Sequence, residues 1–222
     1  MTRLSTAVLV IALLAAPSGA RANGDSPGGG PPTTFERFVL SACAPCVRES
    51  YPVASLAIAP RALPGFPRAA AGAASRSGEV AIEVVRASQL DRPGWQSLAL
   101  RVTLSVITGG ESYRLGVGLL DAADVPALAK AVVEMARIAI APPANPSVES
   151  ADIDFHGGSL RIGVLRLRGD SVAYVQTGDL PTLMQRTVWE VPATLYLQAK
   201  DLPALAAALS QAQTTIEKVR GN

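Results

Sequence analysis

The chain has little of several residue types on which common functions depend. Only 5% of its residues are aromatic, so we expect a core built from Leu, Val, Ile and Ala. Lys plus Arg number 20 and Asp plus Glu number 18, which gives a formal net charge of +2. A chain so close to neutrality lacks the basic surface that general nucleic-acid binding requires, and we expect no nucleic-acid partner.

A single histidine, His156, limits the metal and catalytic chemistry available. A structural zinc site takes four ligands, whereas the chain offers two cysteines and this one histidine. Asp152, Asp154 and His156 alternate along one predicted strand face, which we interpret as a solvated polar face. A Ser-His-Asp triad could form only around His156, and no Gly-x-Ser-x-Gly motif is present. Gly116-Val117-Gly118 lies inside a predicted strand and precedes no helix, so we expect neither a phosphate loop nor a cofactor.

The N-terminus has the features of an export signal. Arg3 precedes an apolar run from Ala7 to Ala16, and Ala20-Arg21-Ala22 fits a small-x-small cleavage site. We therefore predict a signal peptide over 1–22 and a periplasmic or extracellular mature chain. Beyond it, no apolar run approaches the roughly 20 residues of a membrane-spanning helix, and we expect no integral span.

A short phrase occurs twice and organises the rest of the chain. It reads Asp124-Val125-Pro126-Ala127-Leu128-Ala129 and then Asp201-Leu202-Pro203-Ala204-Leu205-Ala206. Each Asp stands where an N-cap carboxylate can accept a first-turn N–H, and each Pro falls in the first turn, where no N–H is needed. Apolar residues then recur at helical spacing. The repetition predicts two related units, each ending in an amphipathic helix.

Alternating apolar residues predict the strands that precede each helix. Leu98 to Val106 gives the clearest alternation, and Gly109-Gly110 predicts a hairpin turn into the next strand. A first unit spans 79–142 with at least three antiparallel strands, and a second spans 147–222 with about four. Between Val164 and Leu165 the alternation changes phase, which predicts a bulge or a strand buried on both faces.

The predicted fold class is α+β, with two related units of an antiparallel sheet followed by a helix. We favour one continuous sheet with both helices on the same side over two sheets that face each other. Arg101, Arg114 and Arg161 would then share the opposite face, where a partner or a second copy could dock. The alternative is that these arginines are scattered and solvated, since net charge by itself identifies no site.

Residues 23–78 are predicted to precede the first unit as a Gly/Pro-rich leader, a cysteine segment and a linker. Cys43-Ala44-Pro45-Cys46 is the only reactive-looking motif in the chain. In an exported protein, two cysteines at this spacing are expected to form a local structural disulfide.

Two resemblances offer alternatives for this segment. The Cys43–Cys46 motif resembles a thioredoxin-type active site, and Val191-Pro192-Ala193-Thr194-Leu195 resembles the cis-proline segment of that superfamily. The resemblance implies Cys43 as the attacking thiol, Cys46 as the resolving thiol and Pro192 as the cis-proline. Separately, Leu40-Ser41-Ala42-Cys43 resembles a lipoprotein-processing box, which implies a lipid anchor on Cys43.

The expected function follows from these patterns. We expect an exported, non-catalytic binding or assembly protein that is stapled by a structural disulfide and recognises a protein or small-molecule partner. Self-association through the face opposite the helices is a second possibility. The alternative function is a thiol–disulfide oxidoreductase of the cell envelope that uses the cysteine pair.

Overall fold

A computed structural model describes residues 32–41, 43, 45–59, 77–92, 94–141, 150–167, 170–178 and 193–221. The predicted signal peptide and Pro192 lie outside the described residues. In chain order the elements are α2 (Thr34–Ser41), β1 (Cys46–Ile58), β2 (Ser77–Gln89), β3 (Gln96–Thr108), β4 (Glu111–Asp121), α3 (Val125–Ile140), β5 (Ser150–Gly157), β6 (Leu160–Leu167), β7 (Asp170–Thr177), β8 (Ala193–Gln198), the 3₁₀ turn η3 (Ala199–Asp201) and α4 (Leu202–Arg220).

Hydrogen bonds define two separate four-stranded antiparallel sheets, in the orders β1-β2-β3-β4 and β5-β6-β7-β8. The mixed α+β class is confirmed, and the favoured single continuous sheet is wrong. The two sheets meet where β4 reaches the turn between β5 and β6. There the Leu119 N–H donates to Ser159 Oγ at 2.8 Å, and the Leu119 carbonyl accepts the Ser159 N–H at 3.1 Å. Because a turn occupies these polar groups of β4, no strand of the second sheet extends the first sheet at this point.

The first sheet begins earlier than the sequence pattern indicates. β1, which lies within the segment 23–78, pairs along its length with β2. Its register shifts between Pro52 and Ala54, which breaks the period-two pattern that identifies the other strands. Pro52 is tolerated because β1 is an edge strand, where an N–H can be dispensed with.

β2 and β5 follow the predicted alternation. The pairing of β3 with β4 shifts register between Leu104 and Ser105, and four consecutive residues of β7, Val172 to Val175, are buried. Gly109 and Gly110 adopt φ values of 62° and 85°, in agreement with the hairpin turn predicted between β3 and β4. The pairing of β6 with both neighbours is unbroken, so of the two alternatives predicted at Leu165, a bulge or burial on both faces, the bulge is not observed. Leu165 instead lies half-buried on the face opposite Val164, which is fully buried.

Asp124 and Asp201 occupy the N-cap positions of α3 and α4, with a proline in the first turn of each helix. Neither carboxylate makes the predicted capping bond to its own helix within the described residues. Both residues have a helical backbone, with φ of −93° and −86°, whereas a capping side chain usually projects from an extended residue. The Asp201 carboxylate accepts the Gln198 N–H at 3.0 Å instead, which closes the short turn before α4.

The end of α3 coincides with the prolines that were predicted to stop it. Ala141, the last residue before Pro142, has an extended backbone with φ −73° and ψ 146°, which is the conformation that contact with a following proline ring favours. The Arg166 guanidinium on β6 donates to the carbonyls of Ile138 and Ala141. A cation at this position also complements the negative end of the helix dipole.

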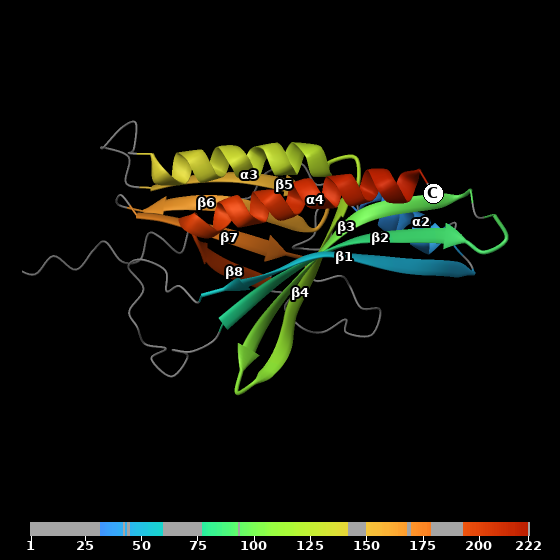
Figure 1. Ribbon diagram of the computed structural model, residues 1–222, viewed down its shortest axis with the longest axis horizontal. Helices are drawn as coiled ribbons and strands as arrows, with labels where there is room; N and C mark the ends of the chain where they lie inside the picture. The colour runs from blue at the N-terminus through green and yellow to red at the C-terminus, as the bar shows by residue number, and fades with distance from the viewer. Residues whose placement is uncertain are drawn as a thin grey trace, which may run out of the picture.

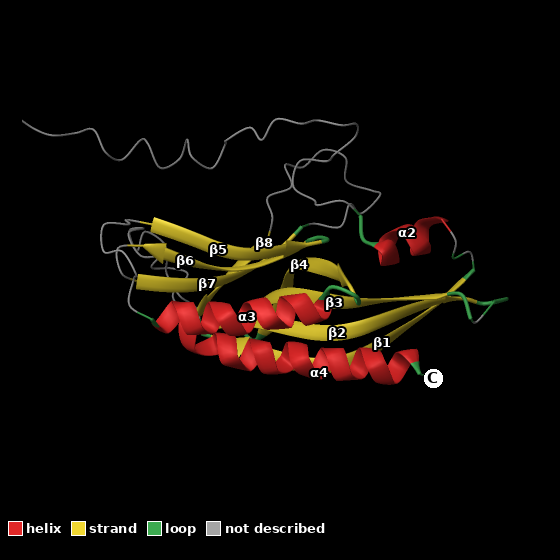
Figure 2. Cartoon of the chain, turned by 90° about the horizontal axis from the view of Figure 1, so that it is seen from above, coloured by secondary structure: helices red, strands yellow, loops and turns green. Residues whose placement is uncertain are grey.

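Both long helices lie side by side and antiparallel on the same side of the two sheets (Figures 1 and 2). α3 follows the first sheet in the chain but packs on β5, β6 and β7 of the second. α4 follows the second sheet but packs on β1 and β2 of the first. The helices are therefore exchanged between the sheets. None of the helices among the described residues combines the length and apolarity that crossing a membrane would require.

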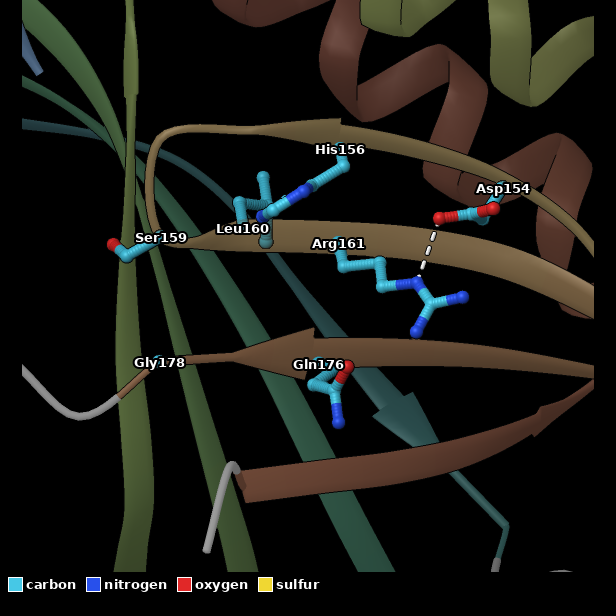
Figure 3. Close-up of a pocket in the computed structure, with 7 residues that line it drawn as sticks. All are labelled: Asp154, His156, Ser159, Leu160, Arg161, Gln176 and Gly178. Carbon is cyan, nitrogen blue, oxygen red and sulfur yellow. Dashed lines mark hydrogen bonds and ion pairs between the residues drawn. The ribbon is translucent and has the colours of Figure 1, made fainter. Parts of the chain in front are cut away.

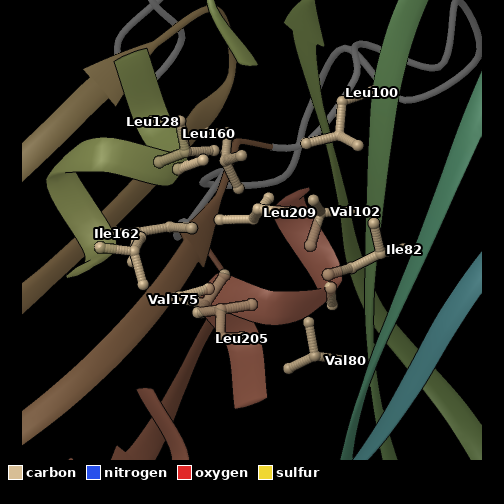
Figure 4. Close-up of a cluster of buried hydrophobic side chains, with 14 of the residues drawn as sticks. Val80, Ile82, Leu100, Val102, Leu128, Leu160, Ile162, Val175, Leu205 and Leu209 are labelled. Atoms are coloured by element: carbon tan, nitrogen blue, oxygen red, sulfur yellow. The ribbon is translucent and has the colours of Figure 1, made fainter. Parts of the chain in front are cut away.

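The exchange joins both sheets and both helices in one apolar core (Figure 4). Buried side chains from β2 and β3, such as Ile82 and Val102, belong to the same cluster as Ile162 and Val175 of the second sheet. Leu128 of α3 and Leu205 of α4 are almost completely buried within it. Neither sheet is thus covered without the helix from the other half.

The first sheet carries a second, smaller apolar cluster on its opposite face, where α2 packs. Phe35 of α2 contacts a cluster that includes Ala99 of β3 and Leu119 of β4. The helix N-terminus is held by the Asp121 carboxylate, which accepts the N–H groups of Thr34 and Phe35 at 2.8 and 3.1 Å. α2 is therefore an integrated part of the first sheet.

Candidate functional site

The face of the second sheet that points away from the long helices carries a row of polar side chains, which we call the outer face of the second sheet. Strand register places the following residues on it: Asp152, Asp154 and His156 on β5, Arg161 and Gly163 on β6, Tyr174 and Gln176 on β7, and Thr194 and Tyr196 on β8. The alternation predicted for the three β5 residues agrees with this register, because their neighbours Ile153 and Phe155 pack against the core. No helix among the described elements packs on this face.

Arg161 lies at the centre of this face and organises its charges. Its Nε donates to Asp154 Oδ2 at 2.6 Å, and its Nη2 donates to Asp152 Oδ2 at 2.9 Å. Its guanidinium also lies over the Tyr174 ring, 5.5 Å from the ring centroid. Burial alone would lower the pKa of Arg161, but the hydrogen bond to Asp154 and the nearby negative charges outweigh it and raise that pKa. The guanidinium is therefore held charged and in one orientation.

Tyr174 crosses the sheet to complete this network. Its hydroxyl donates to Asp152 Oδ1 at 3.0 Å, and its residue is only 7% exposed. Burial raises the pKa of the Tyr174 phenol, and the adjacent Asp152 charge raises it further. The ring can lie here because residue 163 is glycine: a Cβ at Gly163 would come within 2.5 Å of the Tyr174 hydroxyl oxygen. The network therefore requires a residue without a side chain at position 163.

A half-open cleft of about 410 Å³ lies beside the Arg161 network. It is lined by Asp154, His156, Ser159, Leu160, Arg161, Gln176 and Gly178 (Figure 3). Its polar groups come from adjacent strands: His156 from β5, Arg161 from β6 and Gln176 from β7. The Gln176 amide is oriented by donating to Thr194 Oγ1 at 3.1 Å. The cleft therefore offers a carboxylate, an imidazole, a guanidinium and an amide, all from paired strands of one sheet.

One end of the cleft is formed by the junction of the two sheets. Ser159 is held by Leu119 of β4, and its own carbonyl accepts the Gly178 N–H at 2.8 Å. The preceding Gly158 has φ 56°, and a Cβ there would collide with the Leu119 carbonyl. These contacts fix the wall of the cleft relative to the first sheet.

The three predicted face arginines do not form one surface. Arg101 lies on the outer face of the first sheet, where it forms an ion pair with Glu83 at 2.7 Å and donates to Ser50 Oγ at 3.1 Å. Arg114 lies on β4 of the same sheet, where it is exposed and pairs with Ser105 of β3. Arg161 belongs to the second sheet, so a single docking face containing all three is not observed.

Cys43 and Cys46 form a disulfide with their Cα atoms 4.9 Å apart. Cys43 is 7% exposed, its sulfur lies 3.4 Å from the Ser88 carbonyl oxygen, and Cys46 is the first residue of β1. The pair therefore follows a helix and opens a strand. A thioredoxin-type site needs its cysteines at a helix N-terminus, where the dipole stabilises a thiolate, and this position offers no such dipole.

Metal chemistry finds no support among the residues that the structure describes. Within that part of the chain, no group of three or more His, Cys, Asp or Glu side chains is placed to hold a metal ion. Asp152 and Asp154 both pair with Arg161 instead, and of the two only Asp154 lines the cleft together with His156.

Several residues of the site carry no local sequence signal. Tyr174 and Gln176 lie in a short strand whose burial cannot be read from its composition, and both are brought to Arg161 by strand pairing alone. Gly163 was recognisable only as a glycine inside a strand, which often marks a close approach of another group.

Outside the site, the start of α2 does carry a local sequence signal. Thr33-x-x-Glu36 has the spacing of a capping box, and the Glu36 N–H donates to Thr33 Oγ1 at 3.1 Å.

Comparison with models of known protein families and with curated proteins finds no match for this chain.

Proposed function

We propose that this chain is an exported, non-catalytic binding protein that takes a small polar ligand in the cleft on the outer face of the second sheet. The observation that carries the proposal is the convergence of His156, Arg161 and Gln176 from three adjacent strands onto one half-open cleft. Binding sites of this kind combine a preformed concavity with a few fixed polar groups. Such groups on strands are held more precisely than groups on loops.

The charge balance of the site favours a ligand with a cationic group. Asp152 and Asp154 provide two carboxylates against the single guanidinium of Arg161. One negative charge is thus left in excess, and an ammonium group near Asp154 would neutralise it. Gln176 and Ser159 supply neutral hydrogen-bonding groups for the remainder of the ligand.

The disulfide is assigned a structural role in this proposal. The burial of Cys43 and the position of Cys46 at the start of a strand both support it. A redox catalyst needs an accessible, low-pKa thiolate, and neither feature favours one. The oxidoreductase alternative makes a separate prediction: fully reduced protein would reduce insulin, and the activity would disappear in Cys43→Ser.

Export without a lipid anchor fits the position of α2. Processing at Cys43 would remove every residue before it, including Phe35 and the N–H groups that Asp121 binds. We infer that the signal peptide ends near residue 22 and that the mature chain keeps α2. Mass spectrometry of the mature protein tests this inference, and an acylated Cys43 at its N-terminus would contradict it.

We also infer that the two halves arose from one duplicated unit. Each half runs through four antiparallel strands into a helix that begins with Asp, an apolar residue and Pro. Each helix also packs on the first strands of the opposite sheet, α3 on β5 to β7 and α4 on β1 and β2, which supports this origin.

The proposed ligand class can be tested with simple probes. NMR titration of the mature chain would compare putrescine, a diamine, with the neutral polyol sorbitol and the dianion glutarate. We expect putrescine to shift the amide resonances of His156, Arg161 and Gln176, and Asp154→Asn to abolish the shifts. Glu134→Gln removes a carboxylate on α3 that pairs with Arg137 at 2.9 Å and should leave the shifts unchanged. Shifts with glutarate alone, or with none of the probes, would contradict the proposal.

A further inference from the structure

One end of the molecule exposes large apolar side chains. Leu90 and Trp95 are 62% and 55% exposed in the turn between β2 and β3, and Leu40 and Val47 are exposed on either side of the disulfide. The remaining large exposed apolar residues in the described part of the chain lie elsewhere, on the β3–β4 hairpin and on α3. We call the residues 40–48 and 88–97, in so far as they are described, the disulfide tip.

The two segments of the tip are directly connected. The Leu90 N–H donates to the Pro45 carbonyl at 3.2 Å, and Cys46 pairs with Gln89 across β1 and β2. Figures 1 and 2 show the β2–β3 turn and the start of β1 together at one end of the long axis. The exposed apolar side chains of the two segments therefore gather at this end of the molecule.

Positive charge surrounds these apolar residues. Arg48 and Arg92 are exposed in the tip and Arg37 is exposed on the adjacent α2, against the single exposed carboxylate of Asp91. The Arg92 guanidinium lies 5.3 Å from the centroid of the Trp95 ring. A tryptophan beside an arginine on an apolar surface is a combination that suits the interface between lipid headgroups and acyl chains.

Four N–H groups in and beside the turn are already hydrogen-bonded within the protein. The N–H groups of Gln89, Leu90, Arg92 and Trp95 all donate to backbone carbonyls at 2.8 to 3.2 Å. An unsatisfied N–H group is costly to bury in lipid, so a turn without this bonding would resist insertion. The disulfide and the buried Cys43 side chain hold the neighbouring segment against the turn.

We propose that the disulfide tip docks the protein on an anionic phospholipid surface, with Trp95 and Leu90 inserted at headgroup depth. The backbone hydrogen bonds of the turn, the pairing of Trp95 with Arg92 and the arginines around the tip together favour a bilayer over a protein groove as the partner. This interaction is independent of the ligand cleft, which lies on the second sheet. Each arginine near an anionic surface should raise the affinity by about fivefold.

Vesicle binding tests the proposal with the oxidised mature chain. Trp189→Phe leaves Trp95 as the only tryptophan, because the chain has two. We expect its fluorescence to shift to the blue and the protein to sediment with vesicles of phosphatidylcholine mixed with phosphatidylglycerol. Pure phosphatidylcholine vesicles should bind at least about tenfold more weakly, since two or more arginines lose their attraction.

Matched variants distinguish vesicle binding through the disulfide tip from non-specific adsorption. Trp95→Ser and Leu90→Ser should each reduce vesicle binding at least about tenfold, as expected for removing a buried large apolar side chain. Ile140→Ser, which removes a side chain 78% exposed at the end of α3, should bind as the parent chain does. Circular dichroism would verify that all three variants remain folded. Equal binding by all variants, or no binding to anionic vesicles, would overturn the proposal.

Discussion

The two sheets share a strand order and a common helix layer, but their outer faces differ. On the first sheet, α2 covers one end of the outer face, and the single ion pair of Arg101 with Glu83 occupies part of the remainder. On the second sheet no described helix packs on that face, and Arg161 binds two carboxylates beside a cleft. The same framework thus carries a packed, stabilising face on one sheet and a polar face suited to binding on the other.

The shared core sets the largest expected effect. Leu128→Ala on α3 and Leu205→Ala on α4 should each lower the free energy of unfolding by about 2–5 kcal/mol, because both side chains are almost completely buried. Each variant should still unfold in one transition, since each helix covers the other half's sheet. Chemical denaturation followed by circular dichroism and Trp fluorescence measures this. Separate transitions for the two sheets would show that the halves are independent.

The disulfide stabilises the end of the first sheet where α2 packs. Replacing both cysteines, as Cys43→Ser with Cys46→Ser, should lower the free energy of unfolding by about 2 kcal/mol, the value for closing a four-residue loop. Hydrogen exchange should rise in α2 and at the start of β1 while β5 to β8 stay protected. Unchanged exchange in α2 would mean that Asp121 and Phe35 hold this helix without the disulfide.

The glycine beneath Tyr174 tests the second sheet alone. Gly163→Ala should cost about 1–3 kcal/mol, because the added methyl group overlaps the Tyr174 ring and displaces its hydroxyl from Asp152. Gly94→Ala is the matched control, since a Cβ there meets no atom within 4 Å. Thermal unfolding compares the two variants, and equal stability would show that the Tyr174 ring moves aside freely.

Replacing Arg101 or Arg161 should change the free energy of unfolding by smaller amounts, and the two replacements should differ. Arg101→Gln removes one half-exposed ion pair and should change stability by at most about 1 kcal/mol. Arg161→Gln leaves Asp152 and Asp154 facing each other and should cost slightly more. The excess should shrink when salt screens the two carboxylates. Urea titrations at low and high salt measure the difference, and a larger effect of Arg101→Gln would reverse the comparison.

The second sheet should also be more sensitive to alkali. Burial raises the pKa of Tyr174, so its neutral form is favoured in the folded protein. This contribution is complete below the unfolded tyrosine pKa of about 10 and is lost as the pH rises through the folded value. Tyr174→Phe should therefore reduce the loss of stability above about pH 10. An alkaline response identical to that of the parent chain would contradict the assignment.

Local patterns predicted most of the strands and both long helices, but they could not predict how these elements are combined. The alternation of Leu98 to Val106 and the repeated Asp-x-Pro phrase identify β3 and both long helices, because these signals lie within one element. β1 was missed since its bulge at Pro52 interrupts the alternation. The candidate site depends on Tyr174 and Gly163, which only strand pairing brings together.

The exchange of the helices was equally hidden, because an apolar stripe does not specify which sheet it will cover. Leu128 and Leu205 stand at the same position of the repeated phrase, and nothing in that phrase indicates that each helix packs on the sheet of the other half. The choice depends on the length and direction of the connections, and these are not local properties.

The crossed helices have a consequence for how the chain can be divided. Cut after residue 141, the N-terminal fragment would carry α3 without the sheet it covers, and a first sheet whose inner face lacks the helix α4. In a pair of such fragments, the helix of each copy could cover the sheet of the other copy. The two complementary fragments expressed together could associate in the same way. Fragment complementation, or a symmetric dimer of one half, is thus the assembly that this topology makes accessible.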